Sequence, residues 1–226
     1  MDVARAWLDG NGKSLPIEVE AALSANQYFG ATKSWIAEPE AKLKFDSFAG
    51  EPRNSDLAVH IKNKNGNCLL AVEAKADEPF GETIEKTIKA AEVRLAQNPR
   101  SNGLSRVRQL KEAILGNKAK DEVLDTIIRY QLLTACAGAL CEAERSGYSR
   151  ALMLVHEFFT DKTNDIKHRR NGADLNTFVL HISDERISKV EFGLIYGPFR
   201  VFGLPIIKNK IDLFVGKVSR NIRTGG

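Results

Sequence analysis

The sequence has few cysteines, and their spacing is not that of a metal or redox site. Its three cysteines, Cys68, Cys136 and Cys141, form no C-x-x-C motif. An odd number of cysteines in a chain of 226 residues indicates reduced thiols rather than a disulfide framework. We therefore expect a cytoplasmic protein in which these side chains serve packing, without a zinc site of the usual spacing.

A long apolar run is also missing. The N-terminal segment MDVARAWLDG has an early aspartate and no apolar stretch of the kind found in a secretory signal. The longest uncharged stretch in a helical pattern runs from Tyr130 to Cys141. It is shorter than the ~20 apolar residues that a helix needs to cross a bilayer. The sequence therefore predicts neither a secretion signal nor a membrane span.

Several common active-site motifs are missing as well. Gly12-Lys13-Ser14 looks like the end of a phosphate-binding P-loop, but that motif needs a glycine five residues before Gly12, where the sequence has Trp7. We find neither a nucleophilic-serine motif nor the glycine fingerprint of a dinucleotide-binding fold. The sequence gives no support to these enzyme classes.

The chain carries a small positive charge that gathers near its C-terminal end. Its formal net charge is +4, which permits a nucleic-acid partner without requiring one. Over residues 197–226 a single acid, Asp212, accompanies six basic residues: Arg200, Lys208, Lys210, Lys217, Arg220 and Arg223. We expect a basic tail whose Lys217, Arg220 and Arg223 add non-specific affinity for the phosphate backbone.

Alternating and helical patterns together predict an α/β fold with a mixed sheet. The first half should contain a helix over 16–24, strands over 57–61 and 69–75, and helices over 84–95 and 107–114. The second half should contain a long helix over about 121–144, a strand over 151–159, a mobile loop over 160–176 and strands over 175–182 and 190–196. A single domain over 1–226 accounts for these elements, with a core over about 16–160 and C-terminal strands and the basic tail over 175–226.

A glutamate and a lysine interrupt the apolar stretch AVEAKADEPFG. Glu73 and Lys75 lie two residues apart, so their side chains project from the same face of a strand. Turn residues at 63–66 predict a hairpin with the preceding strand. A loop over 63–66 sets Asp56 opposite Glu73, whereas a turn on Asn65-Gly66 sets Asp56 opposite Lys75. Either register places Asp56 on the Glu73/Lys75 face, because a shift of two residues conserves parity.

Asp56 and Glu73 would then form a hard oxygen site suited to Mg²⁺ or Mn²⁺. A metal ion there lowers the pKa of a bound water and stabilises charge on a phosphate oxygen, while the Lys75 ammonium orients the water or steadies the developing charge. This chemistry is phosphodiester hydrolysis. One alternative stays open, a nucleic-acid-binding or protein-interaction module that retains the charges without cleaving.

The pattern resembles the PD-(D/E)XK restriction-endonuclease-like superfamily. Glu73-Ala74-Lys75 follows Asp56 by seventeen residues across a hairpin, and Ser55-Asp56 stands in place of the proline-aspartate of that superfamily. The segments SDLAV, AVEAKADEPFG, IRYQLL and CEAERSGYSRALMLVHEF together resemble a little-characterised family of bacterial nuclease-like proteins. The resemblance implies a restriction-endonuclease-like fold, a mixed β-sheet flanked by helices.

The same resemblance implies a deoxyribonuclease that depends on Mg²⁺ or Mn²⁺. In it, Asp56 and Glu73 are the metal ligands and Lys75 is the catalytic lysine. One branch of the superfamily carries an assisting glutamine on a later helix, for which the candidate is Gln131, and some relatives add a carboxylate from the first helix, for which the candidate is Glu20. Glu78, which follows the strand, is a further candidate accessory residue because of its position. The expected partner is nucleic acid, DNA ahead of RNA, and a homodimer is left open.

Overall fold

The structure is a computed structural model that describes residues 6–7, 14–48 and 53–222. Its strands are β1 (Thr32–Leu43), β2 (Arg53–Asn63), β3 (Gly66–Lys75), β4 (Arg150–Phe159), β5 (Leu194–Phe199) and β6 (Asp212–Asn221). Its helices are α2 (Ile17–Ala25), α3 (Ile84–Gln97), α4 (Gly103–Leu115), the 3-10 helix η1 (Gly116–Lys120), α5 (Glu122–Ile127), α6 (Tyr130–Arg145) and α7 (Asp165–Ile182). Within the described ranges, no helix is both long enough and apolar enough to cross a membrane.

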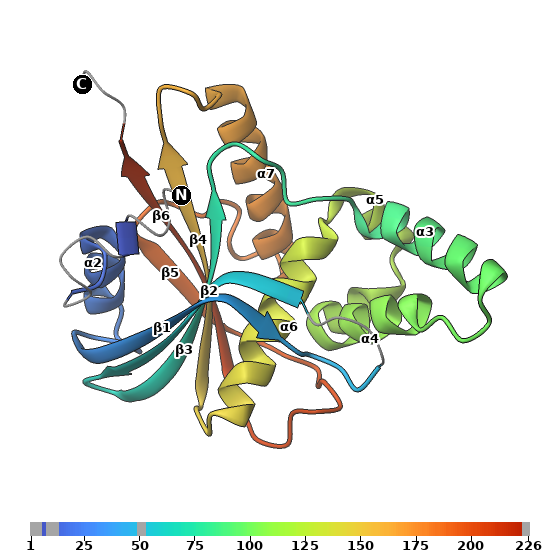
Figure 1. Ribbon diagram of the computed structural model, residues 1–226, viewed down its shortest axis with the longest axis horizontal. Coiled ribbons are helices and arrows are strands. Elements are labelled where there is room, and N and C mark those ends of the chain that lie inside the picture. Colours follow the sequence, from blue (N-terminus) through green and yellow to red (C-terminus); the bar gives the residue numbers. More distant parts are fainter. Residues whose placement is uncertain (1–5, 8–13, 49–52, 223–226) are drawn as a thin grey trace.

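One mixed sheet runs through the molecule in the order β1-β2-β3-β4-β6-β5. The first three strands form an antiparallel meander, β3, β4 and β6 are parallel, and β5 closes the edge antiparallel to β6. Helix α2 lies on one side of the sheet and α6 and α7 lie on the other, while α3, α4 and α5 project away from it (Figure 1). The predicted α/β class, a mixed sheet flanked by helices, is confirmed.

The hairpin of β2 and β3 has the register of a loop over 63–66. Asn63 pairs with Gly66 and Leu57 with Val72, and continuing this register sets Asp56 opposite Glu73. The Asn63 side chain accepts a hydrogen bond from the backbone N–H of Asn65, and Gly66 has a φ of 110°, which favours glycine. The turn residues thus fix the parity that brings Asp56 and Glu73 to one face.

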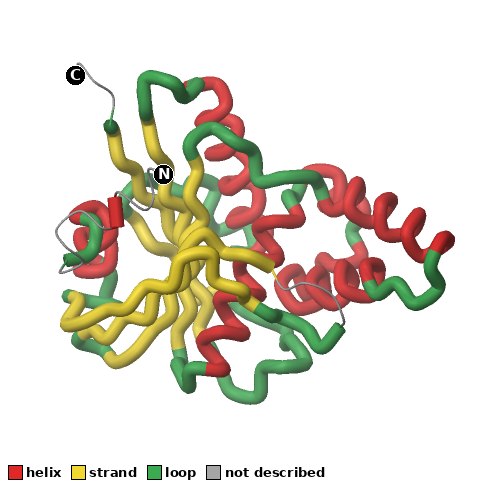
Figure 2. Tube along the Cα trace, in the orientation of Figure 1, coloured by secondary structure: helices red, strands yellow, loops and turns green. Residues whose placement is uncertain are grey.

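The sheet separates two apolar layers, and Figure 2 shows helices on both sides of its strands. Toward α2, the hairpin buries the apolar residues of its other face: Leu57, Val59, Ile61, Leu70 and Val72, with Ala74 partly buried against them. Toward α6 and α7, the hairpin contributes Ala58, Leu69 and Ala71 to the larger core. The face that carries Glu73 and Lys75 is therefore covered by helices.

The predicted long helix over 121–144 is divided into α5 and α6. Ile128 and Arg129 adopt extended backbone between the two helices. There, Arg129 forms a β-bridge with Thr83, the residue before α3. The break matters for the site, because it lets α6 begin at the sheet with Gln131 in its first turn.

Residues 165–182 form α7, where the sequence analysis placed a loop followed by a strand over 175–182. Asn164 caps the helix, its side chain accepting hydrogen bonds from the backbone N–H groups of Ile166 and Lys167. Its buried apolar residues follow a helical spacing: Leu175, Phe178, Val179 and Ile182. The loop and strand predictions were wrong because the first half of the helix is almost entirely polar.

The predicted basic tail is largely the strand β6, which lies between β4 and β5. Residues 213–218 within it are buried. An interior parallel strand is covered on both faces and so lacks polar alternation, and a count of charges could not detect it. The tail prediction was therefore wrong, and the core extends well beyond 16–160. The strand predicted over 190–196 is β5, which begins four residues later.

A buried polar network fastens α2 to the sheet. Trp7 Nε1 donates to His156 Nδ1 at 3.3 Å, and His156 Nε2 lies 2.8 Å from Glu18 Oε1. Because Nδ1 accepts, the imidazole is assigned as neutral and donates to Glu18 through Nε2. Arg220 Nε donates to the same Glu18 oxygen at 2.8 Å. Arg220, expected to bind phosphate, here links β6 to α2.

Acidification is expected to remove the contribution of Glu18 to stability. Burial raises the pKa of Glu18, but hydrogen bonds from His156 and Arg220 outweigh it and hold the pKa at about 2, below the ordinary 4.5. Because the folded-state value is the lower one, the stabilisation is present above about pH 4.5 and is lost as the pH falls toward 2. Denaturant unfolding of the wild type and Glu18→Gln should show a difference at neutral pH that shrinks near about pH 3. A difference that stays constant would contradict this.

Candidate active site

Glu73 and Lys75 stand at the end of β3, beneath the first turn of α6. Their residues are only 1% and 4% exposed. A buried charge is costly unless it is paired and hydrogen-bonded. Each of these two side chains must therefore have partners inside the fold.

Glu73 is held by one cation and one amide. Arg53 Nη2 lies 2.5 Å from Glu73 Oε1, and Gln131 Nε2 donates to Glu73 Oε2 at 2.9 Å. The first contact is an ion pair, since Oε1 has no well-directed hydrogen bond among the described residues. Arg53 is itself fixed by a hydrogen bond from its Nε to Thr134 Oγ1 at 2.9 Å. Residues of β2 and α6 thus position the carboxylate from two sides.

The surroundings raise the pKa of Glu73 above its ordinary value. Burial is the largest cause, and the nearby charge of Asp56 acts in the same direction. The charge of the nearby Arg53 guanidinium and the charge of Lys75 oppose the rise without cancelling it. A further cation beside Asp56 and Glu73 would therefore be stabilising.

Gln131 joins the glutamate to the lysine. Its amide nitrogen donates to Glu73, and its Oε1 accepts from Lys75 Nζ at 3.4 Å. The Lys75 ammonium also lies 4.0 Å from Glu78 Oε1 and 5.1 Å from the centre of the Phe80 ring. The structure thus brings the candidate accessory residue Gln131 directly onto the predicted pair.

Asp56 lies beside this pair and is half-buried. Its Oδ2 accepts a hydrogen bond from the backbone N–H of Ala74 at 2.8 Å. The backbone pairing of β2 with β3 ends at Leu57 and Val72. The Asp56 carboxylate therefore accepts from a backbone N–H group that lies just beyond the last paired residues. This bond fixes Asp56 next to the residue that links Glu73 and Lys75.

The two remaining candidate accessory carboxylates have different positions. Glu78 is at the site, where its Oε2 accepts from the backbone N–H groups of Ala76 and Asp77 while about half of its side chain is exposed. Glu20 lies on α2, across the sheet, and its Oε1 accepts from the Thr32 backbone N–H. The structure therefore does not bring Glu20 to Glu73.

Comparison with protein families gives a match over nearly the whole chain. The family model is described as a domain of unknown function, DUF6946, and it matches residues 1–222. The chain belongs to this family. Curated proteins gave no match, and neither did solved structures. The family description names no activity, so the function of this DUF6946 chain has to be argued from its site.

Arg53 is the site residue that sequence reasoning missed in this DUF6946 chain. Regular alternation along β2 puts residues 53 and 56 on opposite faces of the strand. Arg53 nevertheless reaches Glu73, because β2 has left its pairing with β3 before this position and the guanidinium has a long stem. In the sequence, the only indication of its role was a basic residue three positions before Asp56.

The basic residues expected to contact phosphate are engaged elsewhere. Lys217 is 6% exposed, and its Nζ lies 3.1 Å from Glu157 Oε2. Arg220 pairs with Glu18, as described above, and Arg223 lies outside the described residues. The placement of Lys217 and Arg220 gives no support to a phosphate-binding tail, because both cations already pair with carboxylates within the fold.

The donor set at Asp56 and Glu73 suits a divalent metal ion bound partly by water. Within the described part of the chain, no three His, Cys, Asp or Glu residues form a closed metal site. Mg²⁺ needs fewer protein ligands, since it is often bound through one or two carboxylates and keeps several waters. A carboxylate offers about four lone-pair sites. Arg53 and Gln131 occupy one each on Glu73, so acceptor capacity remains for an ion.

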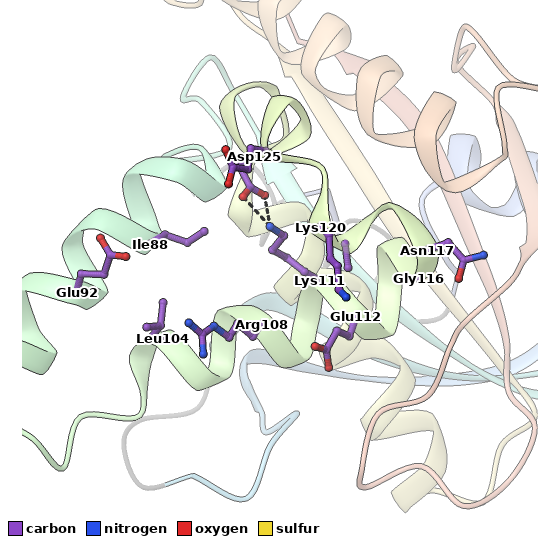
Figure 3. Close-up of a pocket in the computed structure, with 12 residues that line it drawn as sticks. Ile88, Glu92, Leu104, Arg108, Lys111, Glu112, Gly116, Asn117, Lys120 and Asp125 are labelled. Carbon is purple, nitrogen blue, oxygen red and sulfur yellow. Dashed lines mark hydrogen bonds and ion pairs between the residues drawn. The ribbon is translucent and has the colours of Figure 1, made fainter.

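A pocket elsewhere in the molecule is distinct from this site. It lies among α3, α4, η1 and α5 and has a volume of about 670 Å³ (Figure 3). Its buried charges are Lys111 and Asp125, which point toward one another 2.6 Å apart. They neutralise each other, and neither Glu73 nor Lys75 lines this pocket.

Proposed function

We propose that this protein hydrolyses phosphodiester bonds in nucleic acid, DNA ahead of RNA, with the help of Mg²⁺ or Mn²⁺. The observation that carries the proposal is the bridge from Gln131 to both Glu73 and Lys75. Asp56 adjoins the same two residues through Ala74. A carboxylate pair and an ammonium group held together in this way are suited to activating water against a phosphate.

The residues have distinct roles in this proposal. Asp56 and Glu73 hold the divalent ion, which when bound supplies an activated water and charge stabilisation on the phosphate. Lys75 presents an ammonium group, oriented by Gln131, to the charge that develops on the phosphate oxygens. Arg53 favours the ionised form of Glu73 in spite of its burial. The resemblance of Asp56 and Glu73-Ala74-Lys75 to the PD-(D/E)XK pattern supports the same reaction.

One observation favours a second candidate, a module that binds nucleic acid or protein without cleaving. The ion pair between Arg53 and Glu73 gives the buried carboxylate a cation without any metal. A protein that had lost catalysis could retain its fold through such a pair. Metal dependence separates the two candidates.

The test is a cleavage assay with purified protein. End-labelled DNA and RNA, each single- and double-stranded, are incubated with Mg²⁺, with Mn²⁺ or with a chelator. We expect products in the presence of either metal and none with the chelator, with DNA cut faster than RNA. Absence of products from every substrate, while binding persists, would leave the non-cleaving module as the function.

A further inference from the structure

A second polar cluster lies one strand away from Lys75. Glu157 on β4 is the register partner of Lys75, and it is 1% exposed. Its Oε2 lies 3.1 Å from the Lys217 ammonium of β6, and its Oε1 lies 3.8 Å from His168 Nδ1 of α7. The reaction proposed above uses none of these three side chains.

Three polar atoms of this cluster have unused hydrogen-bonding capacity. Glu157 Oε1 and both ring nitrogens of His168 are buried, and among the described residues they have no hydrogen-bond partner. The 3.8 Å between Glu157 and His168 is too long for a hydrogen bond. Because buried polar groups are nearly always satisfied, these atoms point to a ligand that pairs with them.

The cluster lines a pocket of about 780 Å³ between β4, α7 and the segment that precedes β5. Two phenylalanines also line it. The Phe159 ring lies against the His168 ring with the ring centres 4.2 Å apart and the planes tilted by 32°. Phe192 is 45% exposed, and the Lys217 ammonium lies 4.2 Å from the centre of its ring. The pocket therefore combines a partly exposed aromatic ring with an acceptor and an imidazole.

The charges around the pocket indicate a neutral ligand. Three cations, Arg169, Lys189 and Lys217, balance three acids, Glu157, Asp165 and Glu191. A phosphate group gains little binding free energy from balanced charges. A flat ring with N–H donors and ring nitrogens binds more favourably, because it stacks on a phenylalanine and pairs with a carboxylate and an imidazole.

We propose that this pocket binds one unpaired nucleobase. The base stacks on Phe192, and Glu157 accepts a hydrogen bond from one of its N–H groups. The ring nitrogens of His168, which have no hydrogen-bond partner among the described residues, offer a further polar contact to the base. The further claim, that this base belongs to the strand being cleaved, rests on the proposed function, because Glu157 is the register partner of Lys75 in the sheet. The binding of a base to this pocket does not depend on that function.

The test is calorimetric binding in the presence of a chelator, so that no cleavage occurs. The probes are the four deoxynucleoside monophosphates and, without a base, 2-deoxyribose 5-phosphate. At least one nucleotide should bind tenfold or more tightly than the base-free probe, about the effect of one stacked base. Phe192→Ala should weaken that binding about tenfold, and Glu157→Gln should weaken it as well. Val93→Ala, which removes an apolar side chain that is 58% exposed on α3, is the matched control.

The outcomes separate this pocket from the hydrolase proposal. Equal binding of nucleotides and base-free probe, or binding that Phe192→Ala leaves unchanged, would overturn the nucleobase pocket. Phe192 is exposed, so this variant keeps the test valid even if Glu157→Gln fails to fold. Base binding that depends on Phe192 in a protein that cleaves nothing would support the pocket and refute the hydrolase. Cleavage without base binding would support the hydrolase and refute the nucleobase pocket.

Discussion

Replacing Asp56 by asparagine or Lys75 by methionine is expected to lower the rate of metal-dependent cleavage by about a hundredfold or more. Each residue acts on charge that appears in the transition state, where loss of one such group typically has about this effect. Both changes should leave the fold intact. Asparagine can still accept the Ala74 N–H through its oxygen, and methionine fills much of the volume of the buried lysine stem.

Lys89→Met serves as the matched control for Lys75→Met. Lys89 pairs with Glu85 on the surface of α3, where its side chain is 67% exposed. Its loss should not affect cleavage. The double variant of Asp56→Asn and Lys75→Met should be only slightly slower than either single one, because residues that act as a unit are not additive. Cleavage at the wild-type rate by either single variant would remove that residue from the site.

Replacing Glu73 by glutamine is expected to reduce the free energy of unfolding by about 3 to 5 kcal/mol. The side chains of Arg53 and Glu73 are 9% and 2% exposed, so the substitution leaves a buried guanidinium without its anion. Breaking a buried pair from one side typically costs about this much. Denaturant unfolding without added metal measures the loss.

Two comparisons make this result specific to the buried pair. Glu85→Gln breaks an exposed pair by the same chemical change and should alter stability by about 0.5 kcal/mol or less. The double variant Arg53→Met and Glu73→Leu should recover most of the stability lost by Glu73→Gln, because it removes both charges together. A Glu73→Gln protein as stable as Glu85→Gln would show that the Arg53 pair contributes nothing.

The shared face of the site could be predicted because it depends on local rules. Turn residues at 63–66 set the hairpin register, and period-two alternation then fixed the side of the sheet on which Asp56, Glu73 and Lys75 lie. No long-range information was needed. The same parity puts Leu57 and Val72 on the other face, where they pack toward α2.

The burial of that face beneath α6 could not be predicted in the same way. Glu73 and Lys75 are buried because α6 starts above them, directly after Arg129 forms a β-bridge with Thr83. That bridge joins positions far apart in the sequence, and no local pattern encodes it. Arg53 was missed for a related reason, since its contact with Glu73 depends on where β2 leaves β3.

The predictions of structure for the C-terminal half were wrong where charged residues lie in the interior of the fold. Lys217 and Glu157 neutralise each other within the sheet, yet in the sequence Lys217 looks like one more charge of a basic tail. Residues 165–174 look like a polar loop, although the apolar spacing from Leu175 to Ile182 is that of a helix. Pairing between distant charges, which a single sequence does not display, accounts for the first error, and the polar first half of α7 accounts for the second.

The most direct test of the proposed hydrolase compares the wild type and Lys75→Met in one cleavage assay. Labelled DNA is incubated with each protein in Mn²⁺ and in chelator, and the initial rate of product formation is measured. We expect cleavage by the wild type in Mn²⁺ alone, and a rate for Lys75→Met that is lower by about a hundredfold or more. Equal rates for the two proteins, or equal product in Mn²⁺ and chelator, would contradict a metal-dependent site built on Asp56, Glu73 and Lys75.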